Sequence, residues 1–213
     1  MPLYVVFINF KKAFDSIELQ SIWEALQSYG IDAGEIEIIK MIYANATSSI
    51  NVGSSSAIIN VQKGVRQGDT LSPILFILTL QLALDRVNWE HGIHLGERIL
   101  GHLDFADDIV LCSRTLEGLQ SLLDQVAARA REVGLHINVQ KTKWMSNVPE
   151  EEETILLNDA EVEKIQQRNI KKNCCWLERI QQSKTAVNFK KGSCSSEKEI
   201  FPPMRNTCYA LCF

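Results

Sequence analysis

Apolar and polar residues follow regular patterns along the first 148 residues, and the start of the chain predicts one strand and two helices. The stretch LYVVFIN (3–9) is short and rich in β-branched and aromatic residues, which is typical of a buried strand. Between Ser16 and Tyr29 the apolar side chains recur at helical spacing. We therefore predict a helix there, with Ser16 as its N-cap and Gly30 at its end. A second helix is predicted over residues 34–46.

The middle of the chain predicts two hairpins on either side of a long helix. The segments SSINVG and AIINVQ, separated by a short serine-rich stretch, indicate the first hairpin. Residues 70–90 are apolar nearly all round until Asp85, with Pro73 near the first turn, and so predict a central, buried helix. The segments RILGHLDF and DIVLCS predict the two strands of the second hairpin.

The remaining segments complete the predicted fold. They are an amphipathic helix over 115–134, short strands in LHIN and KWMS, and a last hairpin in ILLND and EVEKI. This succession predicts an α+β fold in which helices pack against an antiparallel sheet. After Gln166 no periodicity remains, and segments such as KKGSCSSEKE favour an unstructured chain. We predict a domain over 1–148, a hairpin remnant over 149–165 and an unassigned, poorly ordered tail over 166–213.

Composition and charge leave a nucleic-acid partner open. The 213 residues are 46% hydrophobic and 23% charged, as in an ordinary soluble globular protein. The net charge of −4 hides an uneven distribution: residues 150–163 carry seven acids and no base, and the rest has 22 bases against 19 acids. The longest apolar run, Ile74 to Leu80, is too short for a bilayer, and no signal peptide opens the chain. We therefore expect an intracellular protein without a membrane partner.

The stretch HLDFADDIVL (102–111) places Asp107 and Asp108 side by side in an apolar setting, with Asp104 close by. A tight turn would explain the pair, because Asp tolerates unusual backbone angles there. A metal site would explain it too, since magnesium prefers hard oxygen ligands. Ala106 and Asp107 are not the residues that tight hairpins favour, and such a departure in a well-ordered element tends to mark function. The polar cluster INFKKAFD at the end of the first strand could lie beside this hairpin.

Four motifs together resemble the palm motifs of reverse transcriptases, in the version found in non-LTR (LINE-like) retrotransposons. They are FINFKKAFDS (7–16), GVRQGDTLSP (64–73), FADDIVL (105–111) and GLHINVQKTKWM (134–145), which occur in the family's order and approximate spacing. The stretch YGIDAGEIEIIKMIY between the first two is similar to that class as well. The resemblance covers about residues 3 to 165 and implies a polymerase palm that copies an RNA template by extending a DNA primer with dNTPs.

The resemblance also implies a metal site. In such polymerases, acids on the first strand and at the hairpin tip bind two Mg²⁺ (or Mn²⁺) ions, and Asp107 and Asp108 match the hairpin pair. One ion lowers the pKa of the primer 3′-hydroxyl, and the other holds the triphosphate and stabilises the leaving pyrophosphate. Lys141 matches a lysine near the triphosphate, where it is a plausible electrostatic or proton-donating partner.

The residues that the resemblance assigns to the incoming nucleotide are Phe10, Phe14, Arg66, Gln67 and Gly68. Phe14 matches the aromatic residue that packs under the incoming sugar and rejects a 2′-hydroxyl. The loop with Arg66 and Gln67 matches the one that lies along the nucleotide and the template, where glycine permits close backbone approach. Taken singly, Phe14 could be a core residue and Arg66 could form a loop ion pair with Asp69.

The sequence departs from the family in two respects. The first-strand metal ligand should be an Asp five residues before the aromatic, and that position holds Asn9. An amide oxygen can coordinate magnesium but brings no negative charge, so we expect a degenerate site and an inactive chain. Asp15 does not obviously replace the missing metal ligand, because its side chain should point in a different direction from that of residue 9. The family's fingers would precede the first motif and its thumb would follow residue 165, so we expect the fingers to be missing and the thumb largely missing.

Two alternatives to a polymerase palm fragment stay open. A non-catalytic remnant could bind nucleic acid through Lys11, Lys12, Lys141 and Lys143, and its binding would depend strongly on salt. A nucleotide cyclase also places two metals on a strand and a hairpin, but RQGDTLSP argues against it because a cyclase has no template to grip. The sequence does not indicate an oligomeric state.

Overall fold

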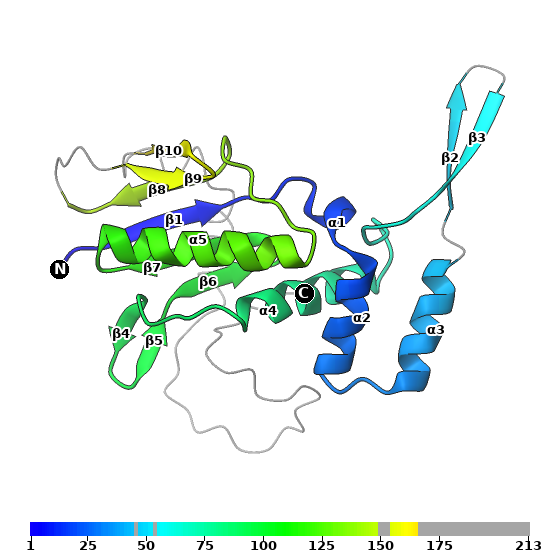
Figure 1. The fold of residues 1–213 in the computed structure, drawn as a ribbon, viewed down its shortest axis with the longest axis horizontal. Coiled ribbons are helices and arrows are strands. Elements are labelled where there is room, and N and C mark those ends of the chain that lie inside the picture. Colours follow the sequence, from blue (N-terminus) through cyan, green and yellow to red (C-terminus); the bar gives the residue numbers. More distant parts are fainter. Residues whose placement is uncertain (45–46, 53–54, 149–153, 166–213) are drawn as a thin grey trace, which may run out of the picture. The chain divides into compact units, whose positions relative to one another are not determined.

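The computed structural model describes residues 1–44, 47–52, 55–148 and 154–165 (Figure 1). It divides the chain into two compact units. The sheet unit contains residues 1–9, 88–124 and the described residues from 138 onward, and the helical unit contains residues 10–87 and 125–137. The predicted tail over 166–213 lies outside the described residues. In the described part, no helix is long and apolar enough to cross a membrane.

The sheet unit is built on one six-stranded sheet in the order β6-β7-β1-β8-β10-β9. Its strands are β1 (Tyr4–Ile8), β6 (His102–Phe105), β7 (Asp108–Ser113), β8 (Lys143–Ser146), β9 (Ile155–Leu157) and β10 (Ala160–Lys164). All neighbours are antiparallel except β8 and β10, which run parallel. The expected α+β class is confirmed, as are the strand over 3–9, the hairpin of ILLND and EVEKI, and the position of the first strand beside the acidic hairpin.

Both faces of the sheet are covered near its centre. On one face of β1 the side chains of Tyr4, Val6 and Ile8 are buried. Figure 1 shows the first half of α5 (Leu116–Glu132) crossing one face of the sheet. On the other face Val110 and Cys112 pack in a cluster with residues of the hairpin formed by β4 (Ile93–Leu95) and β5 (Arg98–Leu100). Burial on both faces explains why β7 is apolar without alternation.

The helical unit is arranged around one buried helix. Its elements are α1 (Ala13–Ser16), α2 (Leu19–Ser28), α3 (Ala33–Ala44), the hairpin of β2 (Thr47–Val52) and β3 (Ser55–Asn60), α4 (Ser72–Leu84) and the end of α5. Helix α4 is apolar on every side and buried along nearly its whole length, as predicted. It packs against α2, and the ring of its Phe76 stacks on Phe14 with centroids 4.7 Å apart.

Three predicted boundaries were wrong. Ser16 is not an N-cap: α2 begins at Leu19, and the Ser16 hydroxyl donates instead to the carbonyls of Lys11 and Lys12 at 3.0 and 2.9 Å. Helix α4 ends at Leu84, six residues before the predicted end, and the N–H groups of Arg86 and Val87 donate to carbonyls only three residues back, those of Ala83 and Leu84. The segment LHIN forms only an isolated bridge, between Ile137 and Phe10.

Gly101 divides the predicted strand RILGHLDF into two strands of different sheets. Strand β5 pairs with β4 and strand β6 with β7. A Cβ atom on Gly101 would lie 2.3 Å from Cε3 of Trp89, so only glycine fits this close approach. The predicted acidic hairpin is confirmed with a shorter first arm, His102–Phe105.

Candidate active site

The register of the sheet brings Asn9 beside the acidic hairpin. In β1 and β7 the last paired residues are Ile8 and Ile109, and within the hairpin Phe105 pairs with Asp108. Continuing the β1–β7 register by one residue sets Asn9 opposite Asp108. Side chains of directly opposed residues lie on the same face of a sheet. The sheet unit thus gathers Asn9 and the paired acids at one edge, and the side chains of all three positions are half-buried.

The hairpin tip is a two-residue turn made by Ala106 and Asp107. Ala106 has a φ of +56°, in the left-handed region that non-glycine residues rarely adopt. Such backbone strain persists only where the surrounding structure fixes it, and here two paired, apolar arms do so. The turn holds Asp107 at the tip, and Asp108 begins the following strand.

The backbone of Asn9 is held by the turn that contains Lys141. Its N–H donates to Thr142 Oγ1 at 3.3 Å, and its carbonyl accepts the N–H of Asn138 at 2.7 Å. The N–H of Lys141 donates to the Asn138 carbonyl at 3.2 Å, while the Lys141 side chain is exposed. The structure therefore places Lys141 in the turn that adjoins the edge. The supporting roles of Asn138 and buried Thr142 were missed by the sequence analysis, although alternation along KTKW places Thr142 on the same side as buried Trp144.

Asp104, two residues before the hairpin turn, is an acid whose pKa is raised by burial. It pairs with buried Ile109, and its Oδ1 atom is inaccessible and has no hydrogen-bond partner among the described residues. Burial raises the pKa of the Asp104 carboxyl from 3.8 to about 6, against a smaller lowering by a backbone hydrogen bond. Its carboxyl thus holds a proton far more readily than an ordinary aspartate.

The metal-ligating side chains at this edge of the sheet carry too little negative charge to hold two metal ions. Asp107 and Asp108 supply carboxylates, and Asn9 can supply only a neutral amide oxygen. Within the described residues, no group of three or more His, Cys, Asp or Glu side chains could hold a metal ion. A third acid would have to stand at Asn9 for the edge to match the charge that two close dications require.

The helical unit holds the residues predicted to meet the nucleotide. Phe14 is half-buried against Phe76, with the rings nearly parallel at 10°. Phe10 is buried, with 5% of its surface exposed, so any contact with a nucleotide must come from its backbone. Gly68 has a φ of +88°, and nothing lies within 4 Å of where its Cβ would be, which leaves its backbone open to close approach.

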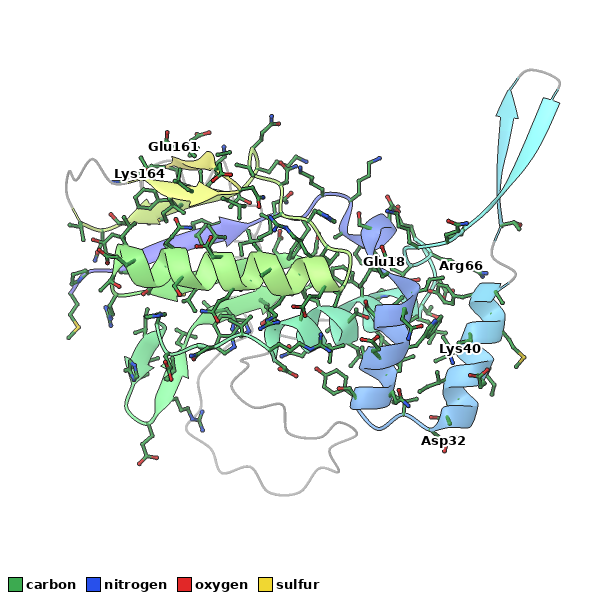
Figure 2. The ribbon with its side chains drawn as sticks, in the orientation of Figure 1. Glu18, Asp32, Lys40, Arg66, Glu161 and Lys164 are labelled. Carbon is green, nitrogen blue, oxygen red and sulfur yellow. The ribbon has the colours of Figure 1, made fainter. Side chains whose placement is uncertain are left out.

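The side chain of Arg66 contacts helix α3. Its Nη2 donates to the Ile42 carbonyl at 2.7 Å, and its guanidinium lies 5.5 Å from the ring centroid of Tyr43. Figure 2 shows Arg66 at the C-terminal end of this helix, where carbonyls lack helical partners. The alternative ion pair with Asp69 is not among those in the described part of the chain. The Asp69 carboxylate instead accepts the N–H of Leu71 at 3.0 Å.

The fold defines the class: it is a polymerase palm. Two structures of telomerase from Candida tropicalis match it, one in complex with a fragment of telomeric RNA and the other an apo form truncated from the C-terminal domain. The RNA complex has a TM-score of 0.55 at 15% identity, covering 76% of this chain and 28% of the telomerase. The truncated form has a TM-score of 0.51 at 16% identity, covering 72% and 32%.

The chain belongs to the family described as reverse transcriptase (RNA-dependent DNA polymerase), whose profile matches residues 2–191. It is 36% identical over 148 residues to the Pol polyprotein of the type-1 retrotransposable element R2 of Nasonia vitripennis, covering 69% of this chain. It is also 36% identical over 156 residues to the polyprotein of the type-2 element R2DM of Drosophila melanogaster, covering 72% of this chain. The chain spans only 14% and 15% of the length of these two polyproteins. The resemblance to non-LTR retrotransposon polymerases is thereby confirmed.

Proposed function

We propose that this chain is the palm of an RNA-directed DNA polymerase whose metal site has lost one of its acids, so that the chain as it stands does not catalyse. The observation that carries the proposal is the β1–β7 register, whose last pair is Ile8 and Ile109; Asn9 and Asp108 are the next residues on the two strands. An Asp at this position would complete three carboxylates at one edge of the sheet. With Asn, two dications bound close together would be neutralised incompletely, and their binding weakens accordingly.

The proposed partners are an RNA template, a DNA primer and a dNTP, with Mg²⁺ or Mn²⁺ as the metal. The family and the retrotransposon relatives support this choice, and one structural neighbour was determined with RNA. Asp107 and Asp108 would hold metal, which supplies activation of the primer hydroxyl and neutralisation of the triphosphate. The exposed side chain of Lys141 could reach toward phosphate, and exposed Lys11 and Lys12 offer further positive charge. Lys143 is a weaker candidate because it is paired with Glu163.

Magnesium-dependent primer extension on an RNA template tests the proposal. The chain and its Asn9→Asp variant are compared, each alone and with a fingers segment of a relative fused in front. We expect extension only from Asn9→Asp with fingers. Extension by the unchanged chain would contradict the proposed loss of activity. If no form extends and none binds metal, the polymerase proposal fails, and salt-dependent binding of nucleic acid would then favour the non-catalytic remnant.

A further inference from the structure

Backbone contacts join the segment that carries Phe14 to the loop of residues 63–69. The N–H of Val65 donates to the Phe14 carbonyl at 2.7 Å, and the N–H of Gly64 donates to the Ile17 carbonyl at 2.7 Å. An isolated bridge pairs Lys63 with Glu18, the residue labelled just before α2 in Figure 2. These segments are about fifty residues apart in the sequence and lie in the same unit.

Gly64 brings the two backbones into direct contact. It has a φ of +87°, and a Cβ atom there would lie 2.9 Å from the Cα and carbonyl oxygen of Asp15 and from the carbonyl oxygen of Phe14. No side chain can be inserted at this distance without moving one of the backbones. The loop therefore begins at a fixed position relative to Phe14.

One side-chain contact extends this junction toward the tip of the loop. Gln67 Nε2 donates to Asp15 Oδ1 at 3.1 Å, and both residues are exposed. An exposed hydrogen bond of this kind adds little to stability, because water competes for both groups. Its effect is directional: the Gln67 amide group is turned toward Asp15, which fixes where its carbonyl oxygen can point.

We propose that Asp15 is a positioning residue which, through Gln67, sets the orientation of the 64–69 loop relative to Phe14 and thereby the affinity for the incoming nucleotide. The nucleotide part rests on the proposed function, whereas the coupling between Asp15 and the loop does not. The family resemblance assigned Gln67 to the nucleotide and assigned no role to Asp15. The structure shows a hydrogen bond between these two residues.

A swap of donor and acceptor tests the coupling in the chain as it exists. Gln67→Glu sets two carboxylates against each other, whereas Asp15→Asn with Gln67→Glu restores a hydrogen bond of reversed polarity at unchanged net charge. We expect Gln67→Glu to speed hydrogen exchange of the amides of residues 65–69 about tenfold, and the double variant to return it. Equal exchange in all three proteins, or no recovery in the double variant, would overturn the proposal.

The pair Gln120 and Asp124 provides the matched control, since Gln120 Nε2 donates to Asp124 Oδ1 at 2.9 Å on the exposed side of α5. Gln120→Glu, which adds the same charge, should leave exchange at residues 65–69 unchanged. If Gln120→Glu alters that exchange as much as Gln67→Glu does, a general charge effect explains the result and the proposal fails.

Primer extension separates positioning from simple stability. In the Asn9→Asp protein with fingers, we expect Gln67→Glu to raise KM for dNTP about tenfold while kcat stays within about twofold, and the double variant to restore KM. A loss of kcat alone, or a KM that the double variant does not recover, would overturn the nucleotide part. If the Asn9→Asp protein itself does not extend primers, the proposed function fails and the nucleotide part fails with it, while hydrogen exchange still decides the coupling.

Discussion

At the scale of single residues, the position of Asn9 and its chemistry are set by different atoms. The backbone N–H and carbonyl of Asn9 make the contacts with Thr142 and Asn138 that hold it in place. An Asp side chain has nearly the same size and would leave both backbone bonds intact. A change between Asp and Asn can therefore remove a charge from the edge without disturbing the fold that presents it.

Asp104 provides a residue-scale prediction on stability. Because its folded pKa, about 6, is above its usual 3.8, the folded state binds the proton more tightly. The stabilisation of the folded state by this proton is complete below about pH 4 and is lost as the pH rises through about 6. We expect Asp104→Asn to raise the unfolding free energy near neutral pH by up to about 3 kcal/mol. Urea denaturation at several pH values measures the difference.

The pH dependence is the discriminating part of that experiment. The Asp104→Asn variant and the original chain should have nearly equal unfolding free energies near pH 4 and diverge toward pH 7. A variant that equals the original chain near pH 4 but is less stable than it near pH 7 would show instead that the ionised Asp104 carboxylate is stabilised by a partner.

At the scale of elements, local patterns predicted most strands and helices, and close tertiary contacts account for the failures. The hairpin of β6 and β7 follows from two apolar arms around a polar tip. By contrast, the break at Gly101 lies where the backbone closely approaches Trp89, twelve residues away in sequence. The same holds for the site. The paired acids could be predicted because they form a local motif, whereas the contact of Asp15 with Gln67 could not, because it joins residues 52 positions apart.

Gly64 and Gly68 allow a matched prediction on the loop. Both have positive φ, but a Cβ would clash with backbone only at Gly64 and would meet nothing at Gly68. We expect Gly64→Ala to lower the unfolding free energy by roughly 2–4 kcal/mol, and Gly68→Ala by only about 1 kcal/mol. Thermal or urea denaturation of both variants checks the order. Similar losses would mean that the left-handed backbone alone, and not the contact with Phe14 and Asp15, restricts Gly64.

At the scale of the whole molecule, the family motifs are divided between the two units. Asn9, the paired acids and Lys141 belong to the sheet unit, whereas Phe14 and the 64–69 loop belong to the helical unit. The resemblance of the four motifs to those of reverse transcriptases was enough to predict the palm fold. They did not predict this division, which depends on packing between segments distant in sequence.

The central claim is that the edge beside β1 is a metal site lacking one acid, and Mn²⁺ binding tests it most directly. Electron paramagnetic resonance, which measures free Mn²⁺, gives the Mn²⁺ affinity of the unchanged chain, of Asn9→Asp and of Asn158→Asp. The last variant is the control, because it adds the same charge in the exposed turn between β9 and β10. We expect Asn9→Asp alone to bind Mn²⁺ roughly tenfold or more tightly than the chain, and the gain to disappear when Asp107→Asn is added. Equal affinity in Asn9→Asp and Asn158→Asp, or a gain that survives Asp107→Asn, would contradict the claim.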